Sequence, residues 1–389
     1  MSTEARKPLK EVISISFNQD ASCLCCATTS GFRVFTTEPF TEPHRRDFDS
    51  SGIGIATMLF RSNIFALVGG GPVPKYPPNK VMIWDDHQCR AIGELAFRTP
   101  VKAVCMRKER IAVAVEQKVY VYDLEDLRLM HQIETAPNPD GLVAMSTATD
   151  ASMVLACPGL QVGQLRVDVM DTKRVHTITA HNSSLAAVTV CPTGKLIATA
   201  SEKGTLIRIF SSMDGSKMRE VRRGSDPARI HSLAFSKEED PEWLAASSDK
   251  GTVHVFSLTG RTSRGGDATA QAQAQAQDDA VVSSEETSTS TSPSKMSSSK
   301  ARLRMSTFTK LVPTRMGGAY LASEWSWAQF RLPDCYKTVV AFGKNGQTLL
   351  IASVTGAFHR ISFSPDRKGS ADQDWFSIFM EEESPGSMT

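Results

Sequence analysis

Apolar positions along the chain fall into short alternating or continuous runs, separated by turns rich in Gly, Pro, Asn, Asp and Ser. The runs have the length of β-strands, and sustained helical periodicity is nearly absent. One sequence pattern recurs: an alternating strand, a polar turn, a strand of small residues, a second turn, and a β-branched or aromatic strand. Its clearest copies begin at Leu185 (LAAVTVCPTGKLIATASEKGTLIRIFS) and Arg229, and looser copies begin near Val12, Ile55, Val101, Leu142 and Thr338.

Seven copies, most of them separated by roughly 40 to 50 residues, match the period of four-stranded propeller blades. We therefore predict an all-β fold, a single seven-bladed β-propeller over residues 1–389, with four antiparallel strands in each blade. Radial closure lets each blade bury its faces on its neighbours and leaves few open strand edges. The run from Asp372 to Met380 predicts the outer strand of blade seven, so this blade is expected to borrow no strand from the N-terminus.

One stretch interrupts the repeat. Between Leu258 and Tyr320 the chain consists of Ala-Gln repeats and Ser/Thr runs, a composition too polar to bury a core of its own. We predict a disordered loop over residues 260–318, inserted in blade six. The run SEWSWAQFRL from Ser323 is expected to supply the outermost strand of that blade, and residues 381–389 are expected to form a flexible C-terminal tail.

The second half of this loop is basic and apolar. Residues 295–315 include six cations and no acid, interleaved with apolar side chains. Such a stretch can lie in a lipid interface, where each cation near an anionic surface contributes on the order of 1 kcal/mol. The predicted membrane contact consists of Lys300, Arg302, Leu303, Arg304, Met305, Phe308 and Lys310. A disordered, solvated loop without lipid contact is the alternative.

Composition and charge narrow the possible classes of function. With 41% hydrophobic residues and no apolar run of about 18 residues, no segment is predicted to span a membrane. The N-terminal segment lacks the apolar core of a secretory signal, so we expect a cytoplasmic protein whose membrane contact is peripheral. The formal net charge of +2 gives no overall attraction to DNA or lipid, so any basic site must be local.

Sequence patterns for catalysis and metal binding are missing. Cys23, Cys25 and Cys26 lie in an apolar run, and the eight cysteines form no paired CxxC units with histidines at zinc spacing, so we predict reduced, buried thiols there and no metal site. The chain has no Walker loop, nucleophile elbow or HExxH motif. We expect neither enzyme activity nor a cofactor. Nucleic-acid binding is not expected either, because basic residues are not interleaved with aromatic ones in a groove-like pattern.

Residues 197–258 resemble a known family. The segment ATASEKGTLIRIFSSMDGSKMREVRRGSDPARIHSLAFS, followed by LAASSDKGTVHVF, is similar to the PROPPINs, WD-repeat propellers that bind phosphoinositides during autophagy. The likeness covers almost the whole chain outside the insertion, and its N-terminal part looks most like the branch linked to autophagic lipid transfer. The family motif usually opens with Phe or Leu. Here Val221 stands at that position and still supplies an apolar strand side chain, and Arg222, Arg223 and Gly224 follow it.

The resemblance implies two phosphoinositide sites. Guanidinium groups meet phosphate oxygens with paired, charge-assisted hydrogen bonds. Consecutive residues on an extended strand point to opposite sides, so two adjacent arginines can serve pockets on both flanks of one blade. The implied first site is His181, Ser201, Thr205, Arg208 and Arg222, and the second is Arg223, Ser248, Lys250, Thr252 and His254. The alternative is that the arginines are solvated surface residues and that the histidines have structural roles.

The resemblance also implies partners and a location. The expected ligands are membranes that carry phosphatidylinositol 3-phosphate (PI3P), phosphatidylinositol 3,5-bisphosphate (PI(3,5)P2) or both, on preautophagosomal, endosomal or vacuolar compartments. A monomer is expected to recruit autophagy machinery such as the lipid-transfer protein. Asn18 and Asp20, in a turn expected to be exposed, are the predicted contacts with that protein, although Asn and Asp are also ordinary turn residues. The alternative function is a WD-repeat scaffold for other proteins that binds no lipid.

Overall fold

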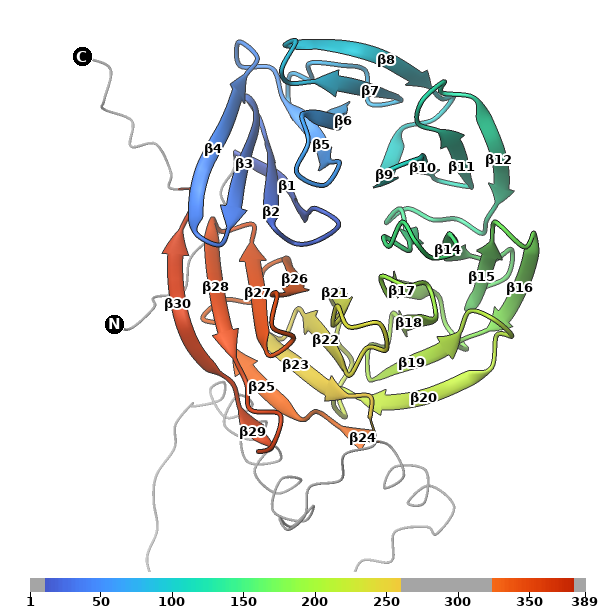
Figure 1. Ribbon diagram of the computed structural model, residues 1–389, viewed down its shortest axis with the longest axis vertical. Helices are drawn as coiled ribbons and strands as arrows, with labels where there is room; N and C mark the ends of the chain where they lie inside the picture. Colours follow the sequence, from blue (N-terminus) through green and yellow to red (C-terminus); the bar gives the residue numbers. More distant parts are fainter. Residues whose placement is uncertain (1–10, 260–323, 381–389) are drawn as a thin grey trace, which may run out of the picture. The chain divides into compact units, whose positions relative to one another are not determined.

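The described part of the chain is built from repeated four-stranded antiparallel sheets. The computed structural model describes residues 11–259 and 324–380. Within these ranges the strands form seven sheets, which follow one another around a ring in the order of the sequence (Figure 1). The predicted all-β, seven-bladed propeller is confirmed.

Blades one to four consist of consecutive strands. Blade one contains β1 (Val12–Phe17), β2 (Cys23–Thr28), β3 (Gly31–Thr37) and β4 (Phe40–Asp47). Blade two contains β5 (Ile53–Met58), β6 (Ile64–Gly69), β7 (Lys80–Asp85) and β8 (Arg90–Ala96). Blade three contains β9 (Val101–Arg107), β10 (Arg110–Val115), β11 (Lys118–Asp123) and β12 (Leu129–Glu134). Blade four contains β13 (Ala144–Met145), β14 (Val154–Pro158), β15 (Gln164–Val169) and β16 (Arg174–Thr179).

Blades five and six each add one short extra strand to this plan, and blade seven keeps four strands. Blade five contains β17 (Leu185–Val190), β18 (Leu196–Ser201), β19 (Leu206–Ser211), β20 (Lys217–Arg222) and β24 (Glu324–Trp325). Blade six contains β21 (Ile230–Phe235), β22 (Trp243–Ser248), β23 (Thr252–Ser257), β25 (Ala328–Arg331) and β29 (Gly369–Ser370). Blade seven contains β26 (Thr338–Phe342), β27 (Thr348–Ser353), β28 (Ala357–Ser362) and β30 (Asp372–Ile378).

The hydrophobic core is divided among the gaps between neighbouring blades. Strand β22 shows how the sequence produces this division, because all six of its residues are buried and alternate side chains face different neighbours. Trp243 and Ala245 pack in the cluster shared with blade seven, whereas Leu244 and Ala246 pack in the cluster shared with blade five. Seven such clusters account for the large buried side chains of the described residues. Small residues in the second strand therefore let adjacent blades approach on both sides.

Blade seven is completed by its own C-terminal strand. Strand β30 pairs with β28 in antiparallel register, so the expected outer strand at Asp372–Ile378 is confirmed, and among the described residues no strand from the N-terminal blade joins this sheet. Blade one contacts blade seven through side chains instead. The ring of Phe358 lies 4.4 Å from that of Phe40 and 6.5 Å from that of Phe17, measured between centroids. An aromatic layer therefore closes the ring.

The strand predicted from Ser323 onward is divided between two blades. Strand β25 pairs with β23, which confirms the fourth strand of blade six. The expectation that it is the outermost strand was wrong, because β29 pairs with its free edge in parallel. Glu324 and Trp325 pair instead with Val221 and Arg222 at the edge of β20 in blade five. The chain thus returns from the insertion onto the strand that bears the first motif arginine.

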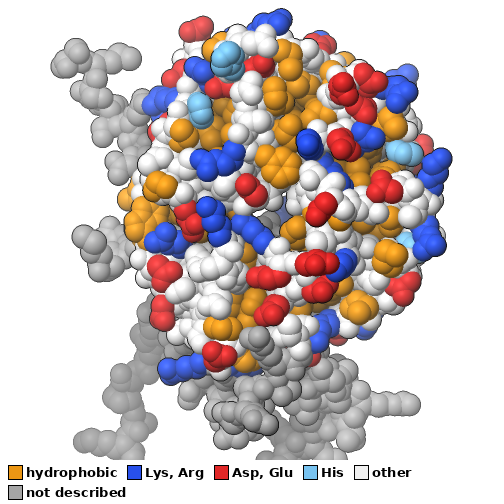
Figure 2. Space-filling view, in the orientation of Figure 1, with side chains coloured by type: hydrophobic (Ala, Val, Ile, Leu, Met, Phe, Trp, Pro, Cys, Tyr) orange, Lys and Arg blue, Asp and Glu red, His pale blue; other side chains and the backbone are white. Residues whose placement is uncertain are grey.

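The connections lie on two faces of the ring. Because strands alternate in direction, turns between the second and third strands share one face with the links from blade to blade. We call this the arginine face, since it carries the turns at residues 202–205 and 249–251 and the link at residues 223–229. The opposite face carries the turns at residues 18–22 and 86–89. On the face drawn in Figure 2, basic and acidic side chains are interspersed.

Several predictions fall outside the described residues. These are the loop at 260–318, its seven proposed membrane contacts at 300–310, and the tail at 381–389. Within the described part, the structure holds no helix of the length and hydropathy needed to cross a bilayer.

Candidate functional site

The first predicted group lies where blades four and five meet. His181 follows β16, and its ring Nε2 lies 2.9 Å from the hydroxyl of Thr199 in β18. Its backbone N–H donates to the carbonyl oxygen of Gly163 at 3.0 Å. Arg208 of β19 donates from Nη1 to the carbonyl oxygen of Ala180 at 2.6 Å. Hydrogen bonds therefore tie the link between the two blades to the middle strands of blade five.

The other members of this group lie at one end of blade five. Ser201 ends β18 and is buried, and Thr205 is half-buried immediately before β19. Arg222 ends β20, is half-buried, and pairs in register with Leu206 of β19. Strand ends thus bring two hydroxyl groups and a guanidinium to the arginine face.

Charge at this junction is already partly balanced. Arg208 donates from Nε to the carboxylate of Glu220 at 2.8 Å, and both side chains are about three-quarters covered. Burial and the positive charge of Arg208 lower the pKa of His181 to about 4. His181 is therefore neutral at pH 7 and can donate or accept one hydrogen bond. A phosphate that bound here would share Arg208 with Glu220.

Arg223 begins the link from blade five to blade six and is only 6% exposed. Its Nε donates to the carbonyl oxygen of Gly204 at 2.9 Å, and its Nη2 donates to that of Asp226. Its backbone N–H donates to the carbonyl oxygen of Thr205 at 2.9 Å. The two motif arginines therefore occupy different environments, one half-buried at a strand edge and one buried against the turn of blade five.

Apart from Arg223, the second group lies on the second and third strands of blade six, β22 and β23, and on the turn between them. Burial and the positive charge of Arg223 lower the pKa of His254 to about 3, so the imidazole is neutral and lies within electrostatic reach of the guanidinium. Its Nδ1 is buried and has no hydrogen-bond partner among the described residues. Ser248 is buried, Thr252 is half-buried, and Lys250 is exposed in the turn between them. The structure thus brings Arg223 and His254 together and leaves Lys250 at the surface.

Two residues of the motif have distinct structural roles. Val221 is fully buried in the core shared by blades five and six. Gly224 lies outside the left-handed region, and a Cβ built on it would meet no described atom within 4 Å. The packing of the described residues does not require a glycine there, and the backbone at this position remains open to a close external contact.

Comparison with protein families agrees with the blade repeat. The profile described as PROPPIN matches residues 11–274, more than half of the chain. The chain belongs to the PROPPIN family. Autophagy-related protein 18e of Arabidopsis thaliana is 36% identical to this PROPPIN over 363 residues, covering 92% of this chain and 85% of the relative. SVP1-like protein 2 of Schizosaccharomyces pombe is 38% identical over 255 residues, covering 65% and 69%.

Solved structures support the fold of this PROPPIN. Hsv2 of Kluyveromyces lactis superposes with a TM-score of 0.67 and 20% identity, covering 95% of this chain and 99% of that one. KlAtg21, solved in complex with the coiled coil of AgAtg16, superposes with a TM-score of 0.70 and 20% identity, covering 95% and 100%. The family named by the sequence resemblance is confirmed, and these neighbours share its propeller.

Sequence reasoning missed two residues of the candidate site. Thr199 is fully buried and holds the ring of His181, and Glu220 balances the charge of Arg208. Thr199 lies two residues before Ser201 in β18, so the two side chains point to the same face of the strand, and this spacing could have identified Thr199. Glu220 had no comparable signal, because it reaches Arg208 only through the register of β19 with β20. The candidate site therefore contains a carboxylate that the motif alone does not reveal.

The predicted partner contact needs a correction. Asn18 was expected in an exposed turn, but it is 5% exposed. Its side-chain amide donates to the carbonyl oxygen of Phe60 at 3.0 Å and accepts from the backbone N–H of Cys23 at 2.9 Å, so it ties blade one to blade two. Asp20 is exposed, and its carboxylate accepts hydrogen bonds from Ser22. Asn18 has a structural role because the neighbouring blade covers the turn, whereas Asp20 remains accessible.

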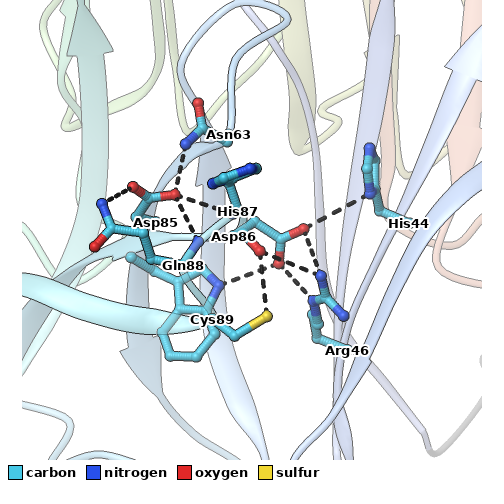
Figure 3. A network of polar contacts seen from close by, with 9 residues as sticks. His44, Arg46, Asn63, Asp85, Asp86, His87, Gln88 and Cys89 are labelled. Atoms are coloured by element: carbon cyan, nitrogen blue, oxygen red, sulfur yellow. Dashed lines mark hydrogen bonds and ion pairs between the residues drawn. The ribbon is translucent and has the colours of Figure 1, made fainter.

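A separate cavity of about 570 Å³ lies between blades one and two, and a network of polar contacts lines part of it (Figure 3 shows the network). Asp86 is central to its polar wall and accepts hydrogen bonds from Arg46 at 2.6 and 3.1 Å and from the indole of Trp84 at 3.2 Å. Burial acts to raise the pKa of Asp86, but these hydrogen bonds outweigh burial and lower it. His44 also lies 3.6 Å from this carboxylate. The network joins the outer strand of blade one to the β7–β8 turn, so we assign it a structural role.

The low pKa of His254 predicts how the stability of this PROPPIN depends on pH. The unfolded imidazole has its ordinary pKa of 6.5 and takes up a proton at pH values where the folded imidazole stays neutral. The free energy of unfolding should therefore decrease as the pH falls from 6.5 towards 3. His254→Phe removes this titration and keeps an aromatic ring beside Phe256, whose centroid lies 6.1 Å away. Thermal melts across this range should show a shallower loss of Tm for the variant. Parallel curves would contradict the assignment.

Proposed function

We propose that this PROPPIN binds 3-phosphorylated phosphoinositides, PI3P and PI(3,5)P2, on the membranes of autophagy, and that it is an effector without catalytic activity. The observation that carries the proposal is the position of Arg222 and Arg223. Arg222 ends β20 of blade five and Arg223 begins the link to blade six, on the arginine face between hydroxyl-bearing strand ends of blades five and six. Membership of the PROPPIN family and the names of autophagy relatives support this function.

The chemistry of both groups suits an inositol phosphate. At the first, Arg208 and Arg222 supply guanidinium donors, and Ser201 and Thr205 supply hydroxyl donors. Neutral His181 adds one further donor without the cost of a second buried charge beside Arg208. A dianionic phosphate offers three strong acceptor oxygens, whereas Glu220 now meets Arg208 Nε with a single carboxylate oxygen, so a phosphate can compete with Glu220 for this guanidinium.

At the second group the bound phosphate would act on Arg223 and His254 together. The charge of Arg223 now lowers the pKa of His254, and a phosphate would offset that charge. Lys250, exposed in the adjacent turn, adds a cation that can reach a ligand at the surface. Two sites on one face would engage two headgroups of one bilayer, which turns modest single affinities into stable attachment because the second binding event is intramolecular.

Co-sedimentation with vesicles that each carry a single phosphoinositide tests the function. Binding to vesicles with PI3P or PI(3,5)P2, and none to vesicles of phosphatidylcholine alone, is the expected result. Equal sedimentation with every vesicle type, or with none, would favour the alternative of a protein-interaction scaffold. Soluble inositol phosphates added as competitors would separate headgroup recognition from general adsorption.

Recruitment of the autophagic lipid-transfer protein is the second part of the proposal. Asp20 lies on the face opposite to the arginines, so a partner could bind there while lipid is engaged. Asp20→Ala should weaken pull-down of that protein several-fold, by loss of an exposed carboxylate, and should leave vesicle binding and Tm unchanged. Asp240→Ala, which removes another exposed carboxylate from the same face, is the control. If both variants capture the lipid-transfer protein equally, Asp20 is not part of the interface.

A further inference from the structure

The turn between β14 and β15 in blade four presents two apolar side chains to solvent. Leu160 is 68% exposed and Val162 is 64% exposed, the highest values among the large hydrophobic residues of the described chain. The turn, residues 159–164, contains no charged residue. We call these six residues the apolar tip. Side chains of this kind at the end of a hairpin gain stability when they leave water.

The apolar tip is closed by its own hydrogen bonds. The backbone N–H of Gly159 donates to the carbonyl oxygen of Gln164 at 2.9 Å, and the N–H of Gln164 donates to that of Gln161 at 3.1 Å. The side-chain amides of these two glutamines are also joined, at 3.0 Å, and the N–H of Gln161 donates to Oε1 of Gln164 at 3.2 Å. A lipid interface favours such a turn, because polar groups satisfied within the turn need no water.

The apolar tip is fixed to the first predicted lipid site. Gly163, the last residue of the tip before β15, accepts hydrogen bonds at its carbonyl oxygen from the N–H groups of Ala180 and His181, each at 3.0 Å. Ala180 in turn accepts the hydrogen bond from Arg208. As a turn between the second and third strands, the tip lies on the arginine face. Any surface that approaches the first site closely therefore also approaches Leu160 and Val162.

A similar apolar element borders the second site. Tyr336 is 38% exposed in the link between β25 and β26, which is on the same face. This link packs against the turn that carries Lys250, since a Cβ at Gly251 would lie 2.9 Å from the carbonyl oxygen of Asp334 and 3.0 Å from the sulfur of Cys335. The exposed Lys203 belongs to the blade-five turn between the two sites. Apolar and basic side chains thus adjoin both groups, as a lipid surface requires.

We propose that the apolar tip is a membrane-inserting element, in which Leu160 and Val162 enter the boundary between headgroups and acyl chains while the first site holds a headgroup. The inference rests on the proposed function, since lipid at the first site brings the tip to the bilayer. A bilayer suits this surface because the tip is uncharged, internally hydrogen-bonded and fixed to the first predicted lipid site. The tip lies outside the insertion at 260–323 and supplies a contact of its own.

The double variant Leu160→Ser with Val162→Ser tests the proposal. Its affinity for phosphatidylcholine vesicles that contain PI3P should fall roughly tenfold, while its affinity for soluble inositol 1,3-bisphosphate stays at the wild-type value. Met213→Ser is the matched control, because Met213 is 59% exposed in the β19–β20 turn on the opposite face. This control should bind vesicles as the wild type does. Melting temperatures of all three proteins establish that each is folded.

A second measurement detects insertion directly. The tryptophan emission of Leu160→Trp should gain a blue-shifted component when PI3P vesicles are added, beyond any change in the wild type, and that of Met213→Trp should not. Wild-type vesicle affinity in the double variant, or no added shift for Leu160→Trp on bound vesicles, overturns the proposal and leaves headgroup recognition intact. If the wild type binds neither vesicles nor inositol 1,3-bisphosphate, the proposed function fails first and this inference fails with it.

Discussion

Simultaneous replacement of Arg222 and Arg223 by Thr should reduce binding to PI3P vesicles by about a hundredfold or more, below the limit of sedimentation. Each arginine can form charge-assisted hydrogen bonds to phosphate, and loss of both removes a principal cation from each site. The loss is multiplied on a vesicle, because attachment through two weak sites depends on both of them. Each single variant should retain one site and bind soluble headgroup at half the stoichiometry.

The double variant needs a test of folding, because Arg223 donates to the carbonyl oxygens of Gly204 and Asp226. Circular dichroism and a thermal melt decide whether the propeller is intact. Arg128→Thr provides the matched control, since the Arg128 side chain is 70% exposed in the β11–β12 turn on the opposite face. A folded double variant that sediments like the control would refute lipid recognition by these arginines.

Asp86→Ala should produce the largest loss of stability among the variants considered. The carboxylate is 5% exposed, and its removal leaves the guanidinium of Arg46 and the indole of Trp84 without the acceptor they share. Loss of a partner from a buried, charged hydrogen-bond network costs about 2–3 kcal/mol, since Arg46 itself is partly exposed. Chemical denaturation should show this decrease in the free energy of unfolding.

The comparison with Asp86→Asn separates charge from shape, because the amide keeps an acceptor for Trp84 and loses the ion pair. We expect an intermediate stability for this variant. Both variants should bind inositol 1,3-bisphosphate with wild-type affinity, since the network lies on the opposite face, away from blades five and six. Wild-type stability of Asp86→Ala would show that Arg46 and Asp86 do not hold blades one and two together.

The blades could be predicted from the sequence because the core is divided among the gaps between blades, and this division requires the same pattern of apolar residues in each blade. A strand such as β22, buried on both sides, must be short, small and apolar, and this requirement recurs in every blade. Strands β24 and β29 could not be predicted in the same way, because two residues are too few to show a period. Their positions depend on where the chain runs after the insertion and after β28, which is a property of the assembled ring.

Individual candidate residues could be predicted only where the local sequence pattern distinguishes them. The arginine pair was found from its place between two blade repeats. The burial of Asn18 was not found, because its amide is covered by the Phe60 backbone of the next blade while its own sequence context is that of a turn. Leu160 and Val162 gave no signal either, since two apolar residues in a hairpin are unremarkable until the structure ties their turn to His181 through the carbonyl oxygen of Gly163.

Because an aromatic layer joins blades one and seven, this junction is the place where the ring should open first. No backbone ladder crosses from β1–β4 into β26–β30, so separation there breaks side-chain contacts such as Phe40 with Phe358 and leaves both sheets whole. Local opening at this seam should precede global unfolding. Amide hydrogens along its edge strands would then exchange sooner than those in the interior of blades three and four.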